Sequence, residues 1–201
     1  MVFNVKHQES YSRLELILRS LFGMLYIAIP HFFLLFFVGL WSAILNFLAF
    51  WVILFTGRYP ESWFEFQVKL IKWQMRVNLR LFNLADGYPS FGLTAEDENL
   101  ELNIEYPERL SRGHHLLKVL FGGLYVYLPH GIILLFRFLI SQFLILLSWF
   151  VVLFTGRYPE SFFNFIVGTL RWNLRVTLYM SFLTDAYPPF SGKPDDQLAL
   201  A

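Results

Sequence analysis

Two long stretches of this chain carry almost no charge. Residues 20–57 contain no Lys, Arg, Asp or Glu, and residues 119–156 contain a single charged side chain, Arg137. A membrane-spanning helix needs about 20 apolar residues, whereas one helix over either stretch would be about 57 Å long, well beyond the ~30 Å core of a bilayer. We therefore predict that each stretch forms a helical hairpin that crosses the membrane twice, with its turn near residues 38–39 or near Arg137.

Pro30 and Pro129 interrupt the first arm of each predicted hairpin and leave a second geometry open. A short, kinked hairpin would enter one leaflet and return on the same side without crossing. The Lys and Arg residues outside the turns lie on the side of the open ends. Because cytoplasmic segments are enriched in Lys and Arg, both chain termini are expected in the cytoplasm.

The composition agrees with a protein that faces lipid. The chain has 201 residues, of which 56% are hydrophobic, 20% aromatic and 15% charged, against about 25% charged in an ordinary soluble domain. This much apolar surface excludes intrinsic disorder. The net charge of +1 gives no basis for nucleic-acid binding, and the lack of cysteine excludes disulfides and thiolate metal sites. Residues 1–12 do not resemble a cleavable signal peptide.

The whole chain is a tandem duplication. The sequence Leu-Phe-Thr-Gly-Arg-Tyr-Pro-Glu-Ser at 54–62 recurs unchanged at 153–161, and the same offset of 99 aligns the rest without gaps. We define residues 1–99 as the first repeat and 100–201 as the second. The ionisable residues that both repeats share are the better site candidates; they are Glu9/Glu108, Arg13/Arg112, His31/His130, Arg58/Arg157, Glu61/Glu160, Arg76/Arg175, Asp86/Asp185 and Asp97/Asp196.

A third helix is expected after each hairpin. The hairpins cover about 14–56 and 113–155, and the helices that follow cover about 60–84 and 159–183. In the first repeat, polar residues and Trp, Phe or Leu residues recur at steps of three and four on opposite faces, as in an amphipathic helix that lies in the membrane interface. The second has a narrower polar stripe, so we expect it to be more buried, against lipid, the other repeat or a partner. A spanning helix is the alternative, although Arg171 and Arg175 argue against it.

Short alternating runs at residues 2–6 and 101–105 precede the hairpins, and each is predicted to be a strand that pairs with the other or with a partner. The predicted fold is an all-α integral membrane protein with minor β structure. It consists of two tandem repeats, each with a short strand, a transmembrane helical hairpin and an amphipathic interfacial helix.

The motifs of the second repeat resemble those of a known family. They are Tyr-Pro-Glu-Arg-Leu-Ser-Arg at 106–112, Leu-Pro-His at 128–130, Leu-Phe-Thr-Gly-Arg-Tyr-Pro at 153–159, Leu-Arg-Trp-Asn-Leu-Arg-Val at 170–176 and Thr-Asp-Ala-Tyr-Pro-Pro-Phe at 184–190. The chain resembles the bacterial membrane family called domain of unknown function 4389, in two copies. The first repeat departs from the pattern, with Tyr-Ser-Arg at 11–13 and Ala-Asp-Gly-Tyr-Pro-Ser-Phe at 85–91. The resemblance implies a multi-pass protein of the bacterial inner membrane and hints at cell-envelope lipids, but it implies no catalytic residues.

Basic residues near the membrane are candidates for binding anionic lipid headgroups. Arg58 and Arg157 lie in the repeated Arg-Tyr-Pro-Glu turn, and a guanidinium beside a helix start can hold a phosphate. The alternative is an architectural turn, fixed by pairing of Arg58 with Glu61 or Asp86. The other headgroup candidates are Lys69, Lys72, Arg76, Arg80, Arg171 and Arg175.

The remaining shared residues are assigned mainly structural roles. Turn fixing is assigned to Glu61, Glu160, Asp86 and Asp185. His31 and His130 stand in apolar arms next to proline, where they could handle protons or share a metal; we favour buried polar histidines that bond a carbonyl freed by the proline. No metal site and no cofactor is predicted.

Catalytic motifs are missing from the sequence: it has no Walker loop, no Gly-x-Ser-x-Gly and no His-Glu-x-x-His. We therefore expect a non-enzymatic inner-membrane accessory or scaffold protein that engages anionic lipid or supports an envelope-lipid machine. Two alternatives remain, namely a structural subunit of a larger membrane complex and a membrane-shaping hairpin protein. The expected partners are membrane lipids and, for the subunit alternative, a membrane protein or a second copy; nucleic acid is not expected.

Overall fold

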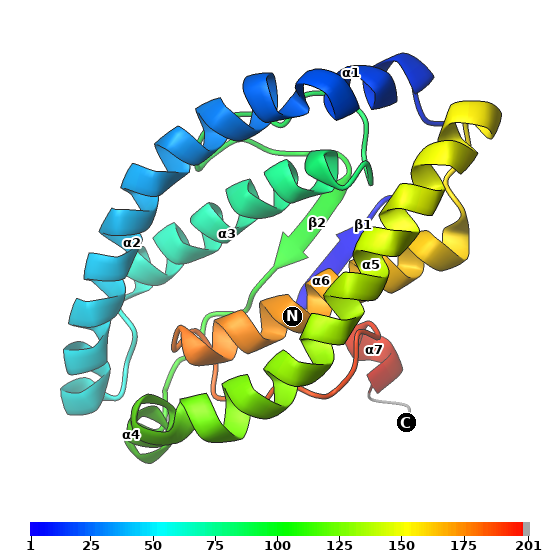
Figure 1. Ribbon diagram of the computed structural model, residues 1–201. Coiled ribbons are helices and arrows are strands. Elements are labelled where there is room, and N and C mark those ends of the chain that lie inside the picture. The colour runs from blue at the N-terminus through cyan, green and yellow to red at the C-terminus, as the bar shows by residue number, and fades with distance from the viewer. Residues whose placement is uncertain (199–201) are drawn as a thin grey trace.

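The structure is a computed structural model that describes residues 1–198 and is mostly helical. The first repeat contains β1 (Val2–Val5), α1 (Arg13–Gly23), the π-helical segment η1 (Met24–Ala28), α2 (Ile29–Thr56) and α3 (Glu61–Leu81). The second contains β2 (Leu100–Asn103), α4 (Arg112–Gly122), η2 (Gly123–Tyr127), α5 (Leu128–Thr155) and α6 (Glu160–Met180), followed by α7 (Asp195–Leu198). Figure 1 shows α1 and α2 along one side, α4 and α5 along the other, and the strands, α3 and α6 between them.

The predicted hairpins are wrong, because each apolar stretch is one continuous helix. α1, η1 and α2 together cover Arg13–Thr56, and α4, η2 and α5 cover Arg112–Thr155. Gly39 and Arg137, at the predicted turns, lie inside α2 and α5. A single glycine such as Gly39 destabilises a helix by only about 1 kcal/mol. Its neighbours include no further turn-forming residue that would reverse the chain. The orientation argument, which depends on these turns, loses its basis as well.

Each long helix bends near its proline. Pro30 and Pro129 stand in the first turn of α2 and α5, and a π-helical segment directly precedes them, as is common where a helix accommodates a missing N–H. In Figure 1, α1 and α2 form one bent arm. Both long helices are long and apolar enough to cross a membrane by length and composition; straightened, their 44 residues would extend about 66 Å.

The prediction that the two short strands pair with each other is confirmed. β1 and β2 form an antiparallel sheet in which Phe3 lies opposite Leu102 and Val2 lies opposite Asn103. Phe3 and Leu102 are equivalent residues of the two repeats, so a residue and its own counterpart face each other. The two repeats are therefore related by an approximate twofold axis through this pair.

Each repeat also caps the C-terminal end of the long helix in the other repeat. α2 and α5 end at Gly57 and Gly156, whose φ angles of 70° and 71° are left-handed and suit glycine. The Tyr11 N–H donates to the Gly156 carbonyl at 2.8 Å, and the Leu110 N–H donates to the Gly57 carbonyl at 2.8 Å. The residues before each long helix thus cap the end of the long helix in the other repeat.

The shared core lies where α3 and α6 pack against the sheet and the inner faces of the long helices. Its buried residues include Phe3, Ile53, Leu79 and Leu84 of the first repeat and Leu102, Val152, Leu178 and Leu183 of the second. α6 buries more of its residues than α3 does, as its narrower polar stripe predicts. Both helices pack against other segments of the chain, and α6 is buried against the core shared with the first repeat, one of the alternatives expected for it.

Candidate functional site

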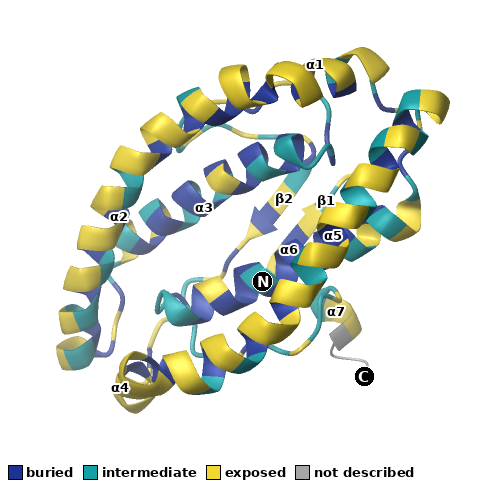
Figure 2. Cartoon of the chain, viewed as in Figure 1, coloured by how far each residue is buried: buried dark blue, intermediate teal, exposed yellow. Residues whose placement is uncertain are grey.

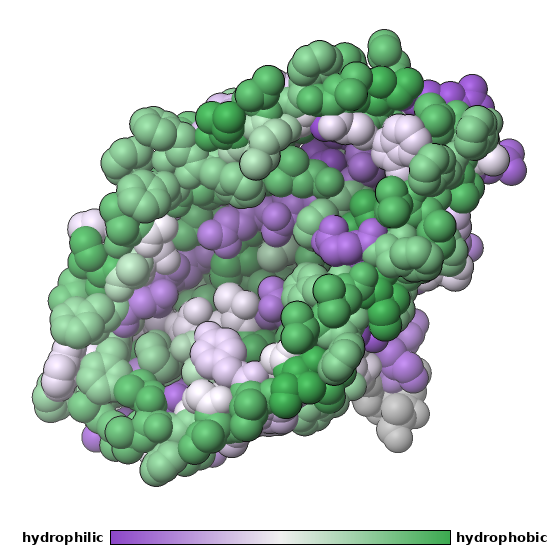
Figure 3. All heavy atoms as spheres, viewed as in Figure 1, coloured by the Kyte–Doolittle hydropathy of each residue, from purple (hydrophilic) through white to green (hydrophobic). Residues whose placement is uncertain are grey.

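The long helices carry their apolar side chains on the outside. Nearly all exposed large hydrophobic residues belong to these two helices, for example Phe33, Phe36 and Phe47 of α2 and Phe136 and Phe143 of α5. Figure 2 shows exposed residues along the outer sides of the helices, and Figure 3 shows that this surface is hydrophobic. A monomeric soluble protein rarely exposes a contiguous apolar patch of more than a few hundred Å². This surface therefore needs an apolar covering.

The inner faces of the same helices mix polar residues with apolar ones such as Leu35, Ile53 and Val152. In α2, His31 and Ser42 are buried, and the Ser42 hydroxyl donates to the Gln67 side chain of α3 at 2.6 Å. In α5, Ser141 and Ser148 are buried. A surface helix of a water-soluble protein has polar residues on its outer face, whereas the outer faces of these helices are largely apolar. The outer faces of the long helices are therefore suited to surroundings less polar than water.

Two predicted headgroup residues on α3 are buried, which corrects their assignment. Arg76 is 1% exposed and donates to the carbonyls of Gly92 and Ala95, while Arg80 is 5% exposed and forms an ion pair with Asp97. The segment after α3 folds back over the helix and supplies these partners. Helical periodicity identifies a polar face, but it does not reveal whether solvent, lipid or another part of the chain covers that face.

The same correction applies to α6. Arg171 donates through Nε and Nη2 to the Phe3 carbonyl at 3.0 and 2.8 Å, and through Nη1 to the Gly192 carbonyl at 2.7 Å. Arg175 forms an ion pair with Asp195. Both arginines are buried, so the guanidiniums of α6, like those of α3, are held inside the fold.

Lys69 and Lys72 stay partly exposed and remain headgroup candidates. Lys69 Nζ pairs with the Glu65 carboxylate, one helical turn away, at 3.2 Å. Both lysines line a surface depression together with Glu96 and Glu101. These carboxylates offset the positive charge of the lysines, so we place the stronger headgroup site elsewhere.

Arg58 and Arg157 are exposed arginines of the repeated turn. Neither forms an ion pair with another described residue, so the architectural pairing of Arg58 with Glu61 or Asp86 is not present. Glu61 and Glu160 are exposed in the first turn of α3 and α6, where a carboxylate suits the positive end of the helix. The two guanidiniums are therefore accessible to a ligand.

Threonine side chains, and not charged residues, hold the repeated turns that contain Arg58 and Arg157. Thr56 Oγ1 accepts the Arg58 N–H at 3.1 Å, and Thr155 Oγ1 accepts the Arg157 N–H at 3.1 Å. The threonine of the repeated Thr-Gly-Arg sequence is the signal for this role. The arginine side chains are thus not needed to form the turn.

Each of these arginines lies near a second arginine from the other repeat. Arg157 and Arg13 line one surface depression of about 560 Å³, and Arg13 Nη2 donates to a carbonyl in the last turn of α5 at 3.2 Å. The end of α2 has the equivalent arrangement. There the Arg112 Nε atom lies 3.7 Å from the position that a Cβ on Gly57 would take, and Gly57 directly precedes Arg58. We call Arg13, Arg58, Arg112 and Arg157 the junction arginines.

The junctions have the chemistry of an anion site. Two planar guanidiniums can each offer paired donors to phosphate oxygens. The N-terminus of α1 or α4, capped by Ser12 or Ser111, adds the positive end of a helix dipole. Glu9 is the one carboxylate that lines the depression of Arg13 and Arg157, which therefore keeps a net positive charge.

Asp86 and Asp185 fix the loops after α3 and α6 through bonds to distant residues. Asp86 pairs with buried Arg19 at 2.8 Å, and Asp185 pairs with buried Lys118 at 2.8 Å. Each carboxylate also accepts the N–H of the N-cap serine of its own long helix at 2.6 Å. Arg19 and Lys118 occupy equivalent positions of the two repeats, and both are cations. A comparison that considers only identical residues misses this pair.

His31 and His130 are buried, but their partner is an indole and not the predicted carbonyl. Trp73 Nε1 donates to His31 Nδ1 at 2.9 Å, and Trp172 Nε1 donates to His130 Nδ1 at 2.9 Å. Each imidazole also stacks on a Phe of the Tyr-Pro-x-Phe motif, with ring centroids 3.9 Å apart. Within the described residues, no group of three His, Cys, Asp or Glu could hold a metal ion.

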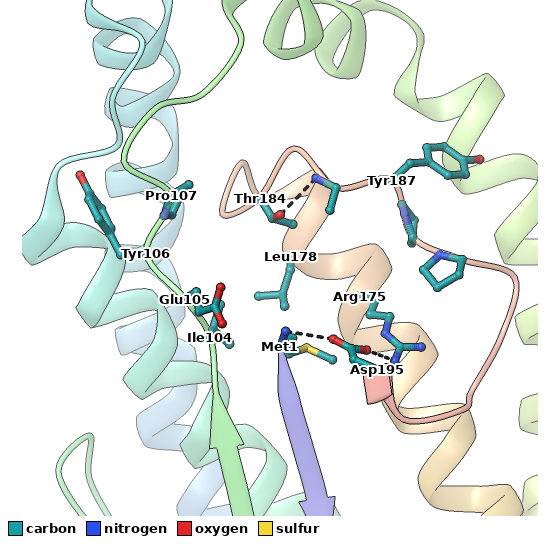
Figure 4. Close-up of a pocket in the computed structure, with 13 residues that line it drawn as sticks. Met1, Ile104, Glu105, Tyr106, Pro107, Arg175, Leu178, Thr184, Tyr187 and Asp195 are labelled. Atoms are coloured by element: carbon teal, nitrogen blue, oxygen red, sulfur yellow. Dashed lines mark hydrogen bonds and ion pairs between the residues drawn. The ribbon is translucent and has the colours of Figure 1, made fainter. Parts of the chain in front are cut away.

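A cavity of about 440 Å³ lies near the end of α6, where residues of the second repeat and Met1 of the first line it (Figure 4). Ile104, Pro107 and Leu178 contribute apolar walls. At its edge Asp195 pairs with Arg175 and accepts from the N-terminal amine at 2.9 Å. Burial alone would raise the pKa of Asp195, but these two partners lower it below its ordinary value. The charged groups at this edge neutralise one another.

The sequence of both repeats matches one family. Residues 13–92 and 117–192 match the family described as a domain of unknown function (DUF4389). The chain belongs to the DUF4389 family. No curated protein and no solved structure matches the chain.

Most motif residues of the two DUF4389 segments have a structural role here. Pro-His supplies the buried imidazole, Asp-x-Tyr-Pro-x-Phe supplies the helix-capping carboxylate and the stacked ring, and Thr-Gly ends the long helix. Arg58 and Arg157 differ from these motif residues, because their side chains are exposed. They are the DUF4389 motif residues that we consider most open to a ligand.

Proposed function

We propose that this DUF4389 protein is a non-enzymatic accessory or scaffold protein of the bacterial inner membrane. Its long helices lie in lipid, and its junction arginines contact anionic headgroups. The observation that carries the proposal is the largely apolar outer face of the long helices, with phenylalanines outside and the histidines and serines held inside. Burial of the outer surface in lipid removes the cost of exposing it to water, about 25 cal/mol per Å².

The headgroup part is supported by the exposure and grouping of the junction arginines. Arg58 and Arg157 follow the ends of apolar helices, where a side chain meets the polar layer of a bilayer. Basic residues near an anionic membrane surface contribute about 1 kcal/mol each. The buried arginines of α3 and α6 have structural partners and take no part in this proposal.

Embedding in lipid is tested by cysteine labelling, since the native chain has no cysteine. In intact membranes, a soluble maleimide is expected to label Phe36→Cys and Phe136→Cys much more slowly than Glu65→Cys, because lipid excludes the reagent from the first two positions. All three residues are exposed in the structure, so protein burial cannot produce the difference. Equal labelling rates would contradict the proposal.

Headgroup binding is tested by replacing Arg58 and Arg157 with glutamine together. At about 1 kcal/mol per cation, we expect the enrichment of anionic over zwitterionic lipid around the purified protein to fall about thirtyfold. Lipid mass spectrometry of the extracted protein measures this ratio. Glu61→Gln with Glu160→Gln is the matched control, because it removes exposed charges of opposite sign nearby and should not lower the enrichment. A double-arginine variant with unchanged enrichment would refute the headgroup role.

Membrane shaping is a second candidate function, favoured by the length of the helices. Straightened, each would extend about 66 Å, about twice the thickness of the bilayer core, and each is bent at its π-helical segment. Such a helix can lie partly along one leaflet and wedge it apart. Ser10→Cys and Ser62→Cys flank the first long helix and are exposed in the structure. Labelling of both from the same side supports a wedge, and labelling from opposite sides supports a crossing helix.

The subunit alternative loses its original motivation. The strands that called for a partner pair with each other. The apolar residues of α6 pack within the chain, against the core shared by both repeats. We therefore do not develop that alternative.

A further inference from the structure

A cavity of about 510 Å³ lies in the second repeat between α5, α6 and the segment that follows α6. Arg137, Arg171 and Lys193 line it, and the described lining residues include no carboxylate. Trp172 and Phe190 add apolar walls. We call it the Arg137 cavity. It collects positive charge that no carboxylate in its wall neutralises.

Arg137 is held in place by uncharged partners. Its Nε donates to Thr169 Oγ1 at 3.1 Å, and its Nη2 donates to the Phe165 carbonyl at 3.2 Å. The guanidinium carbon lies 4.3 Å from the centre of the Phe165 ring. These contacts orient the side chain without cancelling its charge, and its Nη1 forms no hydrogen bond to any described residue. An anion in the cavity can accept from this nitrogen.

Arg171 likewise forms no ion pair with a described residue. All of its hydrogen bonds run to backbone carbonyls, those of Phe3 and Gly192. Burial and the nearby Arg175 lower its pKa below the ordinary value, and this effect outweighs the opposite influence of Asp195 and Asp196. Asp195 is paired with Arg175 and does not line the cavity.

The first repeat provides a natural comparison, because it lacks this arrangement. Its residues at the five positions Arg137, Gly168, Arg171, Gly192 and Lys193 are Val38, Lys69, Lys72, Leu93 and Thr94. The depression there is lined by Glu96, Asp97 and Glu101 as well as by its cations. The acid-free cavity is thus specific to the second repeat.

Two glycines allow the second repeat to build the cavity. A Cβ on Gly192 would overlap with the Gly168 backbone, and a Cβ on Gly168 would lie 3.2 Å from the Gly192 carbonyl and 3.4 Å from Arg137 Nη2. The segment after α6 can therefore rest directly on the helix, which brings the Gly192 carbonyl to Arg171. Lys69 and Leu93 exclude this contact in the first repeat.

We propose that the Arg137 cavity binds a phosphate group, carried by a phospholipid headgroup or by a soluble phosphate compound. Arginine donors match phosphate oxygens, and the aromatic walls suit an adjoining apolar part. The inference rests on the proposed function only in placing α5 beside lipid.

The test is native mass spectrometry of the full chain in an uncharged detergent, with phosphatidic acid as the probe and phosphatidylcholine as the comparison lipid. We expect wild type to retain phosphatidic acid and Arg137→Val, which installs the residue of the first repeat, to bind it about tenfold to hundredfold more weakly. Lys6→Gln is the control, because it removes an exposed positive charge that lies in none of the candidate sites, and it should leave retention unchanged. Competition by inorganic phosphate identifies the phosphate group itself as the ligand, and lack of competition identifies the phospholipid.

Equal retention by wild type and Arg137→Val, or equal binding of phosphatidylcholine, would overturn the proposal. If Arg137→Val fails to fold, Lys193→Gln replaces it, because Lys193 is exposed and its loss should still weaken retention several-fold. The Arg58→Gln, Arg157→Gln variant separates the two hypotheses. It should keep the ligand of the Arg137 cavity even if it loses its preference for anionic membranes.

Discussion

Asp185→Ala is expected to lower the free energy of unfolding by about 3–5 kcal/mol, because it leaves a buried ammonium without a counter-ion. The Lys118 side chain is 1% exposed, and Asp185 is its one carboxylate partner among the described residues. The substitution also removes the acceptor of the Ser111 N–H at the start of α4. Thermal unfolding of the purified protein, followed by circular dichroism, measures the loss.

The first repeat supplies the comparison for this prediction. Asp86→Ala should lower the free energy of unfolding by less than Asp185→Ala does, because Arg19, the partner of Asp86, keeps an ion pair with Glu15 at 3.3 Å. Asp185→Ala combined with Lys118→Met should recover much of the lost stability, because no buried charge remains. If Asp185→Ala alone unfolds at the wild-type temperature, the ion pair is not the support that the structure indicates.

Trp73→Ala is expected to lower the free energy of unfolding by about 3–5 kcal/mol, the range for truncating a buried aromatic side chain. Trp73 is 4% exposed and packs with Ile27, Leu35 and Val77, and its N–H is the donor to His31 Nδ1. Trp73→Phe keeps most of the packing but leaves that nitrogen without a donor, so we expect a smaller loss of about 1–3 kcal/mol. The same unfolding measurement separates the two contributions.

Trp172→Phe is the matched variant in the second repeat. His130 keeps a second contact, from Nε2 to the Tyr187 hydroxyl at 3.2 Å, whereas His31 Nε2 has no partner in the described structure. Trp172→Phe should therefore be tolerated better than Trp73→Phe. The reverse order would argue against a structural role for the indole–imidazole bond.

The sequence predicted those features that depend on local pattern or on repetition. The offset of 99 identified the two repeats, and the alternation at residues 2–6 predicted a strand. The burial of His31 followed from its apolar neighbours. Each of these inferences needs only the residues themselves and their close neighbours in the chain.

The features that the sequence did not predict depend on what covers a surface. Arg76 and Arg171 have the spacing of an exposed basic face, yet the segments that follow α3 and α6 and the strand residue Phe3 bury them. The hairpin prediction assumed that an apolar stretch must fit the bilayer thickness, whereas the helices continue through Gly39 and Arg137. The site at each junction combines arginines from both repeats, a pairing that no spacing within one repeat contains.

The crossed capping of the long helices has a consequence for the origin of the chain. A single repeat would have a strand with no neighbour and a long helix whose final carbonyls lack the donors that Tyr11 and Leu110 now provide. Such a unit could complete its fold only by associating with a second copy as a symmetric dimer. Fusion of the two halves into one polypeptide removes the need for symmetry, because each half is then always paired with the other. The two halves can therefore differ, as they do at Arg137, Gly168 and Lys193, where the first repeat has Val38, Lys69 and Thr94.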